Sequence, residues 1–87
     1  MEIIYSLIAL EDINYWKKSG NKAVQAKISA LIDDIIKHPY TGLGKPEALK
    51  YQLSGSWSRR ITRTDRLVYS INIEDSIIEI ETARGHY

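Results

Sequence analysis

The spacing of hydrophobic residues changes once along this chain of 87 residues, from a helical period in the first half to a period of two in the second. The clearest helical pattern ends at His38-Pro39, and its apolar positions recur every three or four residues: Val24, Ile28, Leu31 and Ile35. This spacing predicts an amphipathic helix that reaches about Lys37 with one face buried. Because aliphatic stripes of this kind form cores, we assign the helix no function beyond packing.

A strand and a shorter helix are predicted ahead of this pattern. Glu2–Tyr5 has the composition of a short strand, and Ser6 is suited to cap a helix that runs to about Lys18. The expected buried residues of this helix are Leu7, Leu10, Ile13 and Trp16. Ser19-Gly20-Asn21 then separates the two helices.

From Tyr51 onward, apolar residues alternate with polar ones, as in Leu67, Tyr69, Ile71 and Ile73. This alternation predicts a meander of strands with a turn at Glu74-Asp75-Ser76. The expected order is β-α-α-β-β-β, an α+β fold in which two helices pack on one face of a mostly antiparallel, twisted sheet. A chain of this length forms one domain, residues 1–87, and leaves the other sheet face for a ligand.

The register of the hairpin around Arg63-Thr64-Asp65 decides which basic residues meet. If these three residues form the loop, Thr62 lies opposite Arg66 and Arg60 lies opposite Val68. Arg60 and Arg66 then share one face of the sheet. A two-residue loop would place them on opposite faces, and the alternation of apolar residues towards a common core favours the first register.

The net charge of +1 hides an uneven distribution of basic residues. Residues 1–41 hold five Lys and five acidic residues, so their charges balance. Between positions 45 and 66, two acidic residues stand against six basic ones, which are Lys45, Lys50, Arg59, Arg60, Arg63 and Arg66. Arg binds phosphate oxygens through paired hydrogen bonds, so this segment indicates a phosphate-binding surface. The simpler interpretation is a solvated, charged sheet edge.

Several classes of site are excluded by composition. The chain has no Cys, hence no disulfide and no thiolate metal site, and its two His are too few for a zinc site. We therefore expect neither a metal nor another cofactor. The longest apolar run, Leu7 to Leu10, is far shorter than the ~20 residues that cross a bilayer. We expect a soluble, intracellular protein that acts without a membrane.

The remaining side chains suit cleavage of RNA, whose 2'-hydroxyl is a built-in nucleophile. Such a reaction needs a base at the 2'-oxygen, an acid at the 5'-oxygen and cations at the phosphate. Glu47, which follows Gly44-Lys45-Pro46, is the candidate base, and His86 is the candidate acid. Tyr87 is placed to stack on a base or to orient a phosphate.

Each of these residues also has a structural interpretation. Glu47 is equally suited to a surface ion pair with Lys45 or Lys50, and a histidine at a chain end is ordinarily solvated. Trp57 and Tyr51 are expected to pack on the sheet face rather than to stack on bases.

Four motifs in this order resemble the YoeB/Txe family of bacterial toxins, a branch of the RelE superfamily. They are Gly42 to Lys50, Leu53 to Thr62, Arg66-Leu67-Val68-Tyr69 and the terminal His86-Tyr87. The resemblance covers essentially the whole chain. It departs at Ala48, where Pro is frequent, at Gly85, where an aromatic is frequent, and at the 63–65 turn, which is usually more acidic.

The resemblance implies a microbial ribonuclease-like fold and cleavage of mRNA on the ribosome in the bacterial cytoplasm. It implies Glu47 as general base, Arg66 as the phosphate-stabilising residue, His86 as general acid and Tyr87 as the terminal tyrosine. Residues that bind RNA around them would be Lys45, Lys50, Arg59 and Arg60. The implied partners are a YefM/Axe-like antitoxin and mRNA, and a homodimer is allowed.

Two other functions fit the same fold. One is a non-catalytic superfamily member that binds a protein target such as DNA gyrase, and the other is an RNA-binding module without activity. The joint presence of Glu47, Arg66 and His86-Tyr87 favours the nuclease, because a pure binding surface has no reason to combine them.

Overall fold

The computed structural model describes residues 1–85, and its elements follow the expected order with one short strand added. The added strand is β2, which carries Glu47, and a single 3-10 turn, η1, follows it. The elements are β1 (Glu2–Tyr5), α1 (Leu7–Ser19), α2 (Lys22–Lys37), β2 (Glu47–Ala48), η1 (Tyr51–Leu53), β3 (Ser56–Arg60), β4 (Arg66–Asn72) and β5 (Ile77–Thr82).

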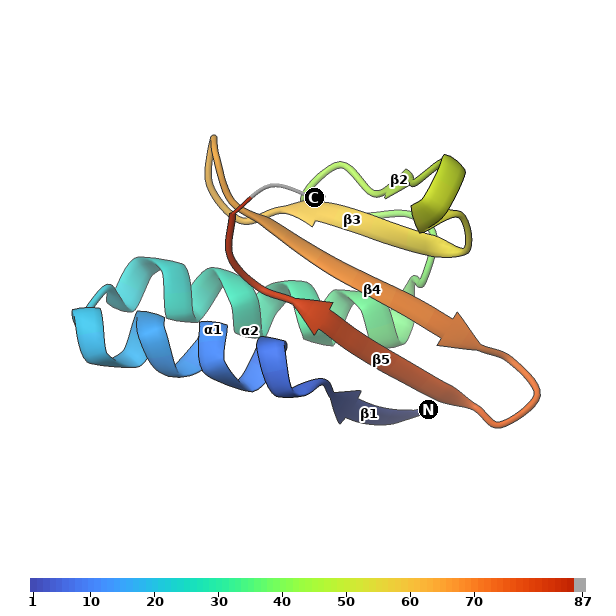
Figure 1. Ribbon diagram of the computed structural model, residues 1–87, viewed down its shortest axis with the longest axis horizontal. Helices are drawn as coiled ribbons and strands as arrows, with labels where there is room; N and C mark the ends of the chain where they lie inside the picture. The colour runs from blue at the N-terminus through green and yellow to red at the C-terminus, as the bar shows by residue number, and fades with distance from the viewer. Residues whose placement is uncertain (86–87) are drawn as a thin grey trace.

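The strands form one twisted sheet in the order β1-β5-β4-β3-β2. Among the strand pairs of the described chain, only β1–β5 is parallel, and the others are antiparallel. The helices α1 and α2 lie side by side and cover one face of this sheet (Figure 1). The α+β prediction is therefore confirmed. The short strands β1 and β2 form the two edges, and no helix within residues 1–85 is long and apolar enough to span a membrane.

Both helices begin with a side-chain cap, of which the cap at Ser6 was predicted from the sequence. The Ser6 hydroxyl accepts a hydrogen bond from the Ala9 backbone N–H at 3.0 Å, and Asn21 caps α2 in the same way through the Val24 N–H. Gly20, with a φ of 72°, ends α1 in the left-handed conformation that favours glycine. The predicted stripe of α2 is buried along its whole length: Val24, Ile28, Leu31 and Ile35.

The predicted buried face of α1 is wrong in its first turn. Leu7 and Leu10 are 72% and 51% exposed, whereas Ala9 and Trp16 are buried. The indole N–H of Trp16 donates to the Ala83 carbonyl oxygen at 2.8 Å, which fixes the rotation of α1 about its axis. That contact joins residues far apart in the chain, so the local pattern could not show it.

The β3–β4 register also differs from the predicted one. Arg60 pairs directly with Arg66, so the connection spans residues 61–65. The Thr62 hydroxyl donates to the Asp65 carboxylate at 2.6 Å and accepts from the Asp65 backbone N–H at 3.0 Å. These bonds close the loop so that Arg66 pairs with Arg60 rather than with Thr62. Because the slip is two residues, an even number, the faces are unchanged, and Arg60 and Arg66 share the uncovered face as predicted.

Candidate active site

Glu47 and Arg66 meet on the sheet face opposite the helices. Glu47 in β2 pairs with Ser58 in β3, and Ser58 pairs with Val68 in β4, two residues beyond Arg66. Residues directly opposite one another in antiparallel strands project to the same face. The Glu47 Oε2 lies 4.0 Å from the Arg66 Nη1. This separation is the outer limit of an ion pair and is longer than a hydrogen bond.

The two side chains differ in their surroundings. The Glu47 side chain is 60% exposed, whereas that of Arg66 is only 15% exposed. Glu47 therefore offers carboxylate oxygens to a ligand approaching from solvent, while the sheet holds Arg66 beneath it. Arg60, directly opposite Arg66, is exposed on the same face.

A hollow of about 470 Å³ opens beside Glu47, and the described residues that line it are those of the segment from Glu47 to Leu53. Lys50 contributes to this hollow and is exposed, and Lys45 is exposed two residues before Glu47. Arg60, Lys45 and Lys50 are therefore accessible, as a surface that binds phosphate requires. The hollow also contains Tyr51, which is 89% exposed and does not pack on the sheet as predicted. Trp57 does pack against the core, beside Tyr40.

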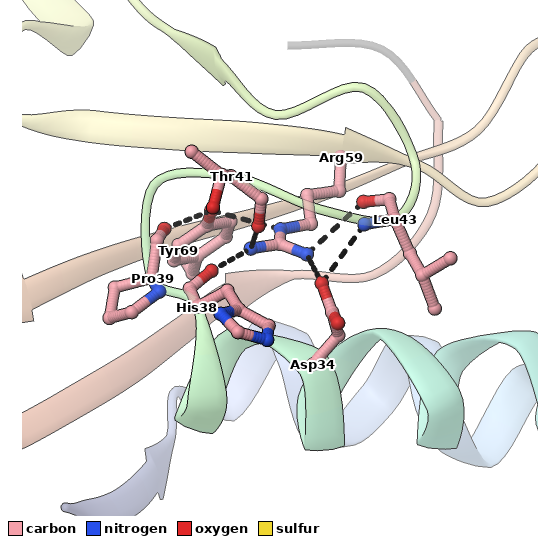
Figure 2. Close-up of polar contacts among 7 residues, drawn as sticks. All are labelled: Asp34, His38, Pro39, Thr41, Leu43, Arg59 and Tyr69. Atoms are coloured by element: carbon pink, nitrogen blue, oxygen red, sulfur yellow. Dashed lines mark hydrogen bonds and ion pairs between the residues drawn. The ribbon is translucent and has the colours of Figure 1, made fainter.

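Arg59 is not part of this surface, and the prediction that it binds RNA is wrong. Its side chain is fully buried on the opposite face of β3, against α2 and the loop that follows α2. The guanidinium donates to five acceptors (Figure 2). They are the Asp34 carboxylate, the carbonyl oxygens of His38, Thr41 and Leu43, and the Tyr69 hydroxyl. No donor is left for a phosphate.

Arg59 acts instead as a clamp for the loop that leads to Glu47. The three carbonyls that it binds belong to the 38–43 segment, and the Asp34 carboxylate also accepts from the Leu43 backbone N–H at 2.9 Å. The Leu43 hydrogen bond, followed by the Arg59 hydrogen bond, holds the pKa of Asp34 below its ordinary value of 3.8. Burial raises the pKa of Tyr69, whose hydroxyl donates to the Pro39 carbonyl.

Gly44 completes the path from the clamp to β2. Its carbonyl oxygen accepts from the Arg60 N–H at 2.7 Å, and its φ is +76°. A Cβ at this position would lie 2.8 Å from a Leu31 methyl carbon and 3.1 Å from the Arg60 carbonyl oxygen. Glycine therefore allows the loop to approach β3 closely, three residues before Glu47.

The segment before the chain end is fastened next to Arg66. The Arg66 N–H donates to the Gly85 carbonyl at 3.0 Å, and the Gly85 N–H donates to the Asp65 carboxylate at 2.8 Å. Hydrogen bonds from Thr62 first, and from Gly85, hold the pKa of Asp65 below its usual 3.8 against the effect of burial. The predicted acid His86 and its neighbour Tyr87 follow Gly85 directly and lie outside the described residues.

Two features of the site were absent from the sequence prediction. One is strand β2, too short to show a pattern, although the Gly-Lys-Pro that precedes it marks a turn. The other is Ser58, whose hydroxyl is fully buried between Glu47 and Val68 and makes no hydrogen bond within residues 1–85. A buried hydroxyl without a partner costs free energy, and no sequence signal identifies it. Among residues 1–85, no cluster of His, Asp and Glu could hold a metal ion.

Comparisons with known proteins agree on one family. The model for a YoeB-like toxin of bacterial type II toxin-antitoxin systems matches residues 5–87. Toxin YoeB of Escherichia coli K12 is 45% identical over 87 residues, covering all of both chains. Among solved structures, the YoeB/ParE toxin from Agrobacterium tumefaciens has a TM-score of 0.95 at 36% identity, with both chains covered completely.

Two structures from Staphylococcus aureus are also similar over 100% of this chain and 98% of theirs. One is a YoeB-YefM complex, with a TM-score of 0.87 at 39% identity, and the other is a YoeB dimer, with a TM-score of 0.88 at 38% identity. The family match spans nearly all of the chain, including the strands that carry Glu47 and Arg66. The chain therefore belongs to the family of YoeB-like toxins of bacterial type II toxin-antitoxin systems.

Proposed function

We propose that this toxin is an endoribonuclease that cleaves mRNA on the ribosome by metal-independent general acid-base catalysis. The observation that carries the proposal is the approach of Glu47 to Arg66, 4.0 Å apart on the uncovered sheet face. A carboxylate and a guanidinium at this spacing are able to contact the 2'-hydroxyl and the phosphate of one nucleotide. Exposed Arg60 and Lys50 beside them supply further positive charge for the RNA backbone.

In the proposed reaction, the Glu47 carboxylate removes the proton of the 2'-hydroxyl, and the 2'-oxygen attacks phosphorus. The Arg66 guanidinium stabilises the charge that develops on the non-bridging oxygens. His86 donates a proton to the departing 5'-oxygen as the P–O bond breaks. The products are a 2',3'-cyclic phosphate and a free 5'-hydroxyl, with Tyr87 stacking on a base or orienting the phosphate.

The partners follow from family membership. The Staphylococcus aureus relatives are seen with YefM and as a dimer, which supports a YefM/Axe-like antitoxin and a second copy as partners of this chain. The antitoxin would be acidic and partly disordered, and would fold over the surface from Lys45 to Arg66, where opposite charge favours docking. Such a complex should lose nuclease activity, and full activity with the antitoxin bound would contradict this arrangement. Action on translated mRNA would place the toxin in the bacterial cytoplasm.

Expression of the toxin in a bacterial host tests the proposed activity. Primer extension should reveal new 5' ends inside coding regions within minutes of induction, and Glu47→Gln, expressed at the same level, should produce none. Growth arrest with intact messages would contradict the nuclease and favour a protein target such as DNA gyrase. Messages bearing a 2'-deoxynucleotide at the cleavage position should resist cutting on purified ribosomes, since the attacking oxygen is missing.

A further inference from the structure

Tyr51 occupies a position that the stability of the fold does not explain. The residue is 89% exposed, the largest value for a large hydrophobic residue in the described part of the chain. Its backbone also has a φ of +59°, a region that glycine and asparagine adopt readily and that a bulky residue adopts only at a cost. The residue therefore accepts backbone strain without burying its ring.

The surrounding contacts hold Tyr51 in this conformation. On one side, Leu49 is buried, and its N–H donates to the Ser56 carbonyl at 2.9 Å. On the other side, the turn η1 is closed by a hydrogen bond from Ser54 N–H to the Tyr51 carbonyl at 3.0 Å. The ring is thus presented to solvent from a segment that both neighbouring contacts fix. Strain of this kind is concentrated at ligand-binding sites.

The position of the ring suggests what it binds. Tyr51 lines the same hollow as Glu47 and Lys50, so an aromatic face, a cation and the proposed base surround one space. This combination matches a nucleotide, whose base stacks on an aromatic ring while its phosphate meets a cation. The hollow also has apolar lining at Ala48, Leu49 and Leu53, and the exposed ring stands between these residues, a cation and the proposed base, a combination that accommodates both the base and the phosphate of a nucleotide.

We propose that Tyr51 stacks on an unpaired base of the mRNA adjacent to the scissile phosphate, and that Tyr51 and Lys50 form a nucleotide subsite beside Glu47. The inference rests on the proposed function and adds a substrate contact to it. Stacking has little sequence selectivity, so the subsite would position the message rather than choose a codon.

The test compares Tyr51→Asn with Tyr51→Phe on programmed ribosomes. Asparagine relieves the strain and removes the ring, so the melting temperature should stay the same or rise while kcat/KM for cleavage falls about 5- to 150-fold. Phenylalanine keeps the ring and should stay within about twofold of wild type. Ile73→Asn, which removes another highly exposed apolar side chain from the β4–β5 turn, is the matched control and should leave cleavage unchanged.

A second measurement reads stacking without the reaction. The mRNA carries a 2'-deoxynucleotide at the cleavage position, which prevents the reaction, and the fluorescent base 2-aminopurine at one or the other neighbouring position. Wild-type toxin and Tyr51→Phe should change the fluorescence of one label, and Tyr51→Asn should not. If Tyr51→Asn changes the fluorescence as much as the wild-type toxin does, the ring does not contact the mRNA and the proposal is overturned. If Tyr51→Asn also cleaves more slowly, the lost contact is with a base of ribosomal RNA instead.

The two proposals fail in different ways. Normal cleavage by Tyr51→Asn, together with weaker binding of the antitoxin, would make Tyr51 part of a protein interface and overturn the subsite while the nuclease stands. If wild-type toxin leaves mRNA intact but changes the 2-aminopurine signal through Tyr51, the proposed activity fails and the base contact stands.

Discussion

Arg59 and Arg60 are neighbours on β3, and their environments are opposite. Arg59 points towards the helices, is fully buried and donates to five acceptors. Arg60 points away from the helices and is exposed opposite Arg66. The basic segment between Lys45 and Arg66 therefore contributes to two regions of the molecule. The inner region is the Arg59 clamp, and the outer region is the Glu47–Arg66 face.

The two regions are connected through the chain between them. The Arg59 clamp fixes residues 38–43, Gly44 bonds to Arg60, and Glu47 pairs with β3 shortly afterwards. The inner region should therefore act through stability and loop position, and the outer region through chemistry. Variants of each region should separate these effects.

The largest expected effect is on catalysis, from deletion of His86 and Tyr87. Catalysis should fall by ~10²–10⁴ because the proposed general acid is lost. The melting temperature should change little, since Ala83 and Gly85 keep their hydrogen bonds to Asp12, Trp16 and Asp65. Single-turnover cleavage and a thermal melt of the same preparation provide the two numbers. Wild-type cleavage by the folded deletion variant would remove His86 from the mechanism.

Arg59→Ala should produce the inverse result, with stability lost first. Truncation removes the hydrogen bonds from a charged, buried guanidinium to the carbonyls of His38, Thr41 and Leu43, a cost of at least about 3 kcal/mol in the free energy of unfolding. Arg60→Ala should change that free energy by less than about 0.5 kcal/mol. Urea titrations measure both. If Arg59→Ala does not fold, Arg59→Lys should still show a clear loss, and equal stability of all variants would refute the clamp.

Arg66→Ala should lower the cleavage rate by ~10²–10³, as expected for one donor that stabilises developing negative charge. The proposed role predicts a change in kcat on ribosomes while the protein remains folded. Arg60→Ala is the control on the same face and should weaken RNA binding by a smaller factor that high salt also reduces. Equal kcat losses for the two variants would mean that Arg66 has no special position.

Acid should weaken the inner region. Asp34 has a pKa below 3.8 in the folded protein, so its contribution to stability is present above about pH 3.8 and is lost as pH falls through the lower, folded pKa. Asp65 shifts in the same direction. The urea concentration at the unfolding midpoint, measured from pH 7 down to pH 2.5, should decrease once the pH is below about 4. Asp34→Asn should flatten part of that decline, and an unchanged acid limb would show that Asp34 is not coupled to folding.

The smallest effect is expected for Tyr69→Phe. It removes one hydroxyl that accepts from Arg59 at 3.1 Å and donates to the Pro39 carbonyl at 2.8 Å, while the buried ring remains. A stability loss of about 1–2 kcal/mol is expected. Cleavage by the folded protein should stay within a few-fold of wild type, because the other Arg59 contacts still hold the loop. A loss comparable to Arg59→Ala would make Tyr69 the centre of the clamp.

Local rules were sufficient for the features that depend on neighbours in the chain. The Ser6 cap, the buried stripe of α2 and the turn after β4 follow from side-chain chemistry and spacing within a few residues. The shared face of Arg60 and Arg66 was also predicted, because parity survives a register error of two. The family motifs predicted Glu47 and Arg66 as site residues, and the structure brings their side chains to 4.0 Å of one another.

The tertiary structure alone decided what depends on distant partners. Sequence gives Arg59 and Arg60 the same chemistry, and only the packing of β3 on α2 buries one of them among carbonyls. The buried face of α1 was set by the bond from Trp16 to Ala83, and the exposure of Tyr51 by the fixed turn around it. Burial and hydrogen-bond partners arise from contacts between segments, and a one-dimensional pattern contains the residues but not those contacts.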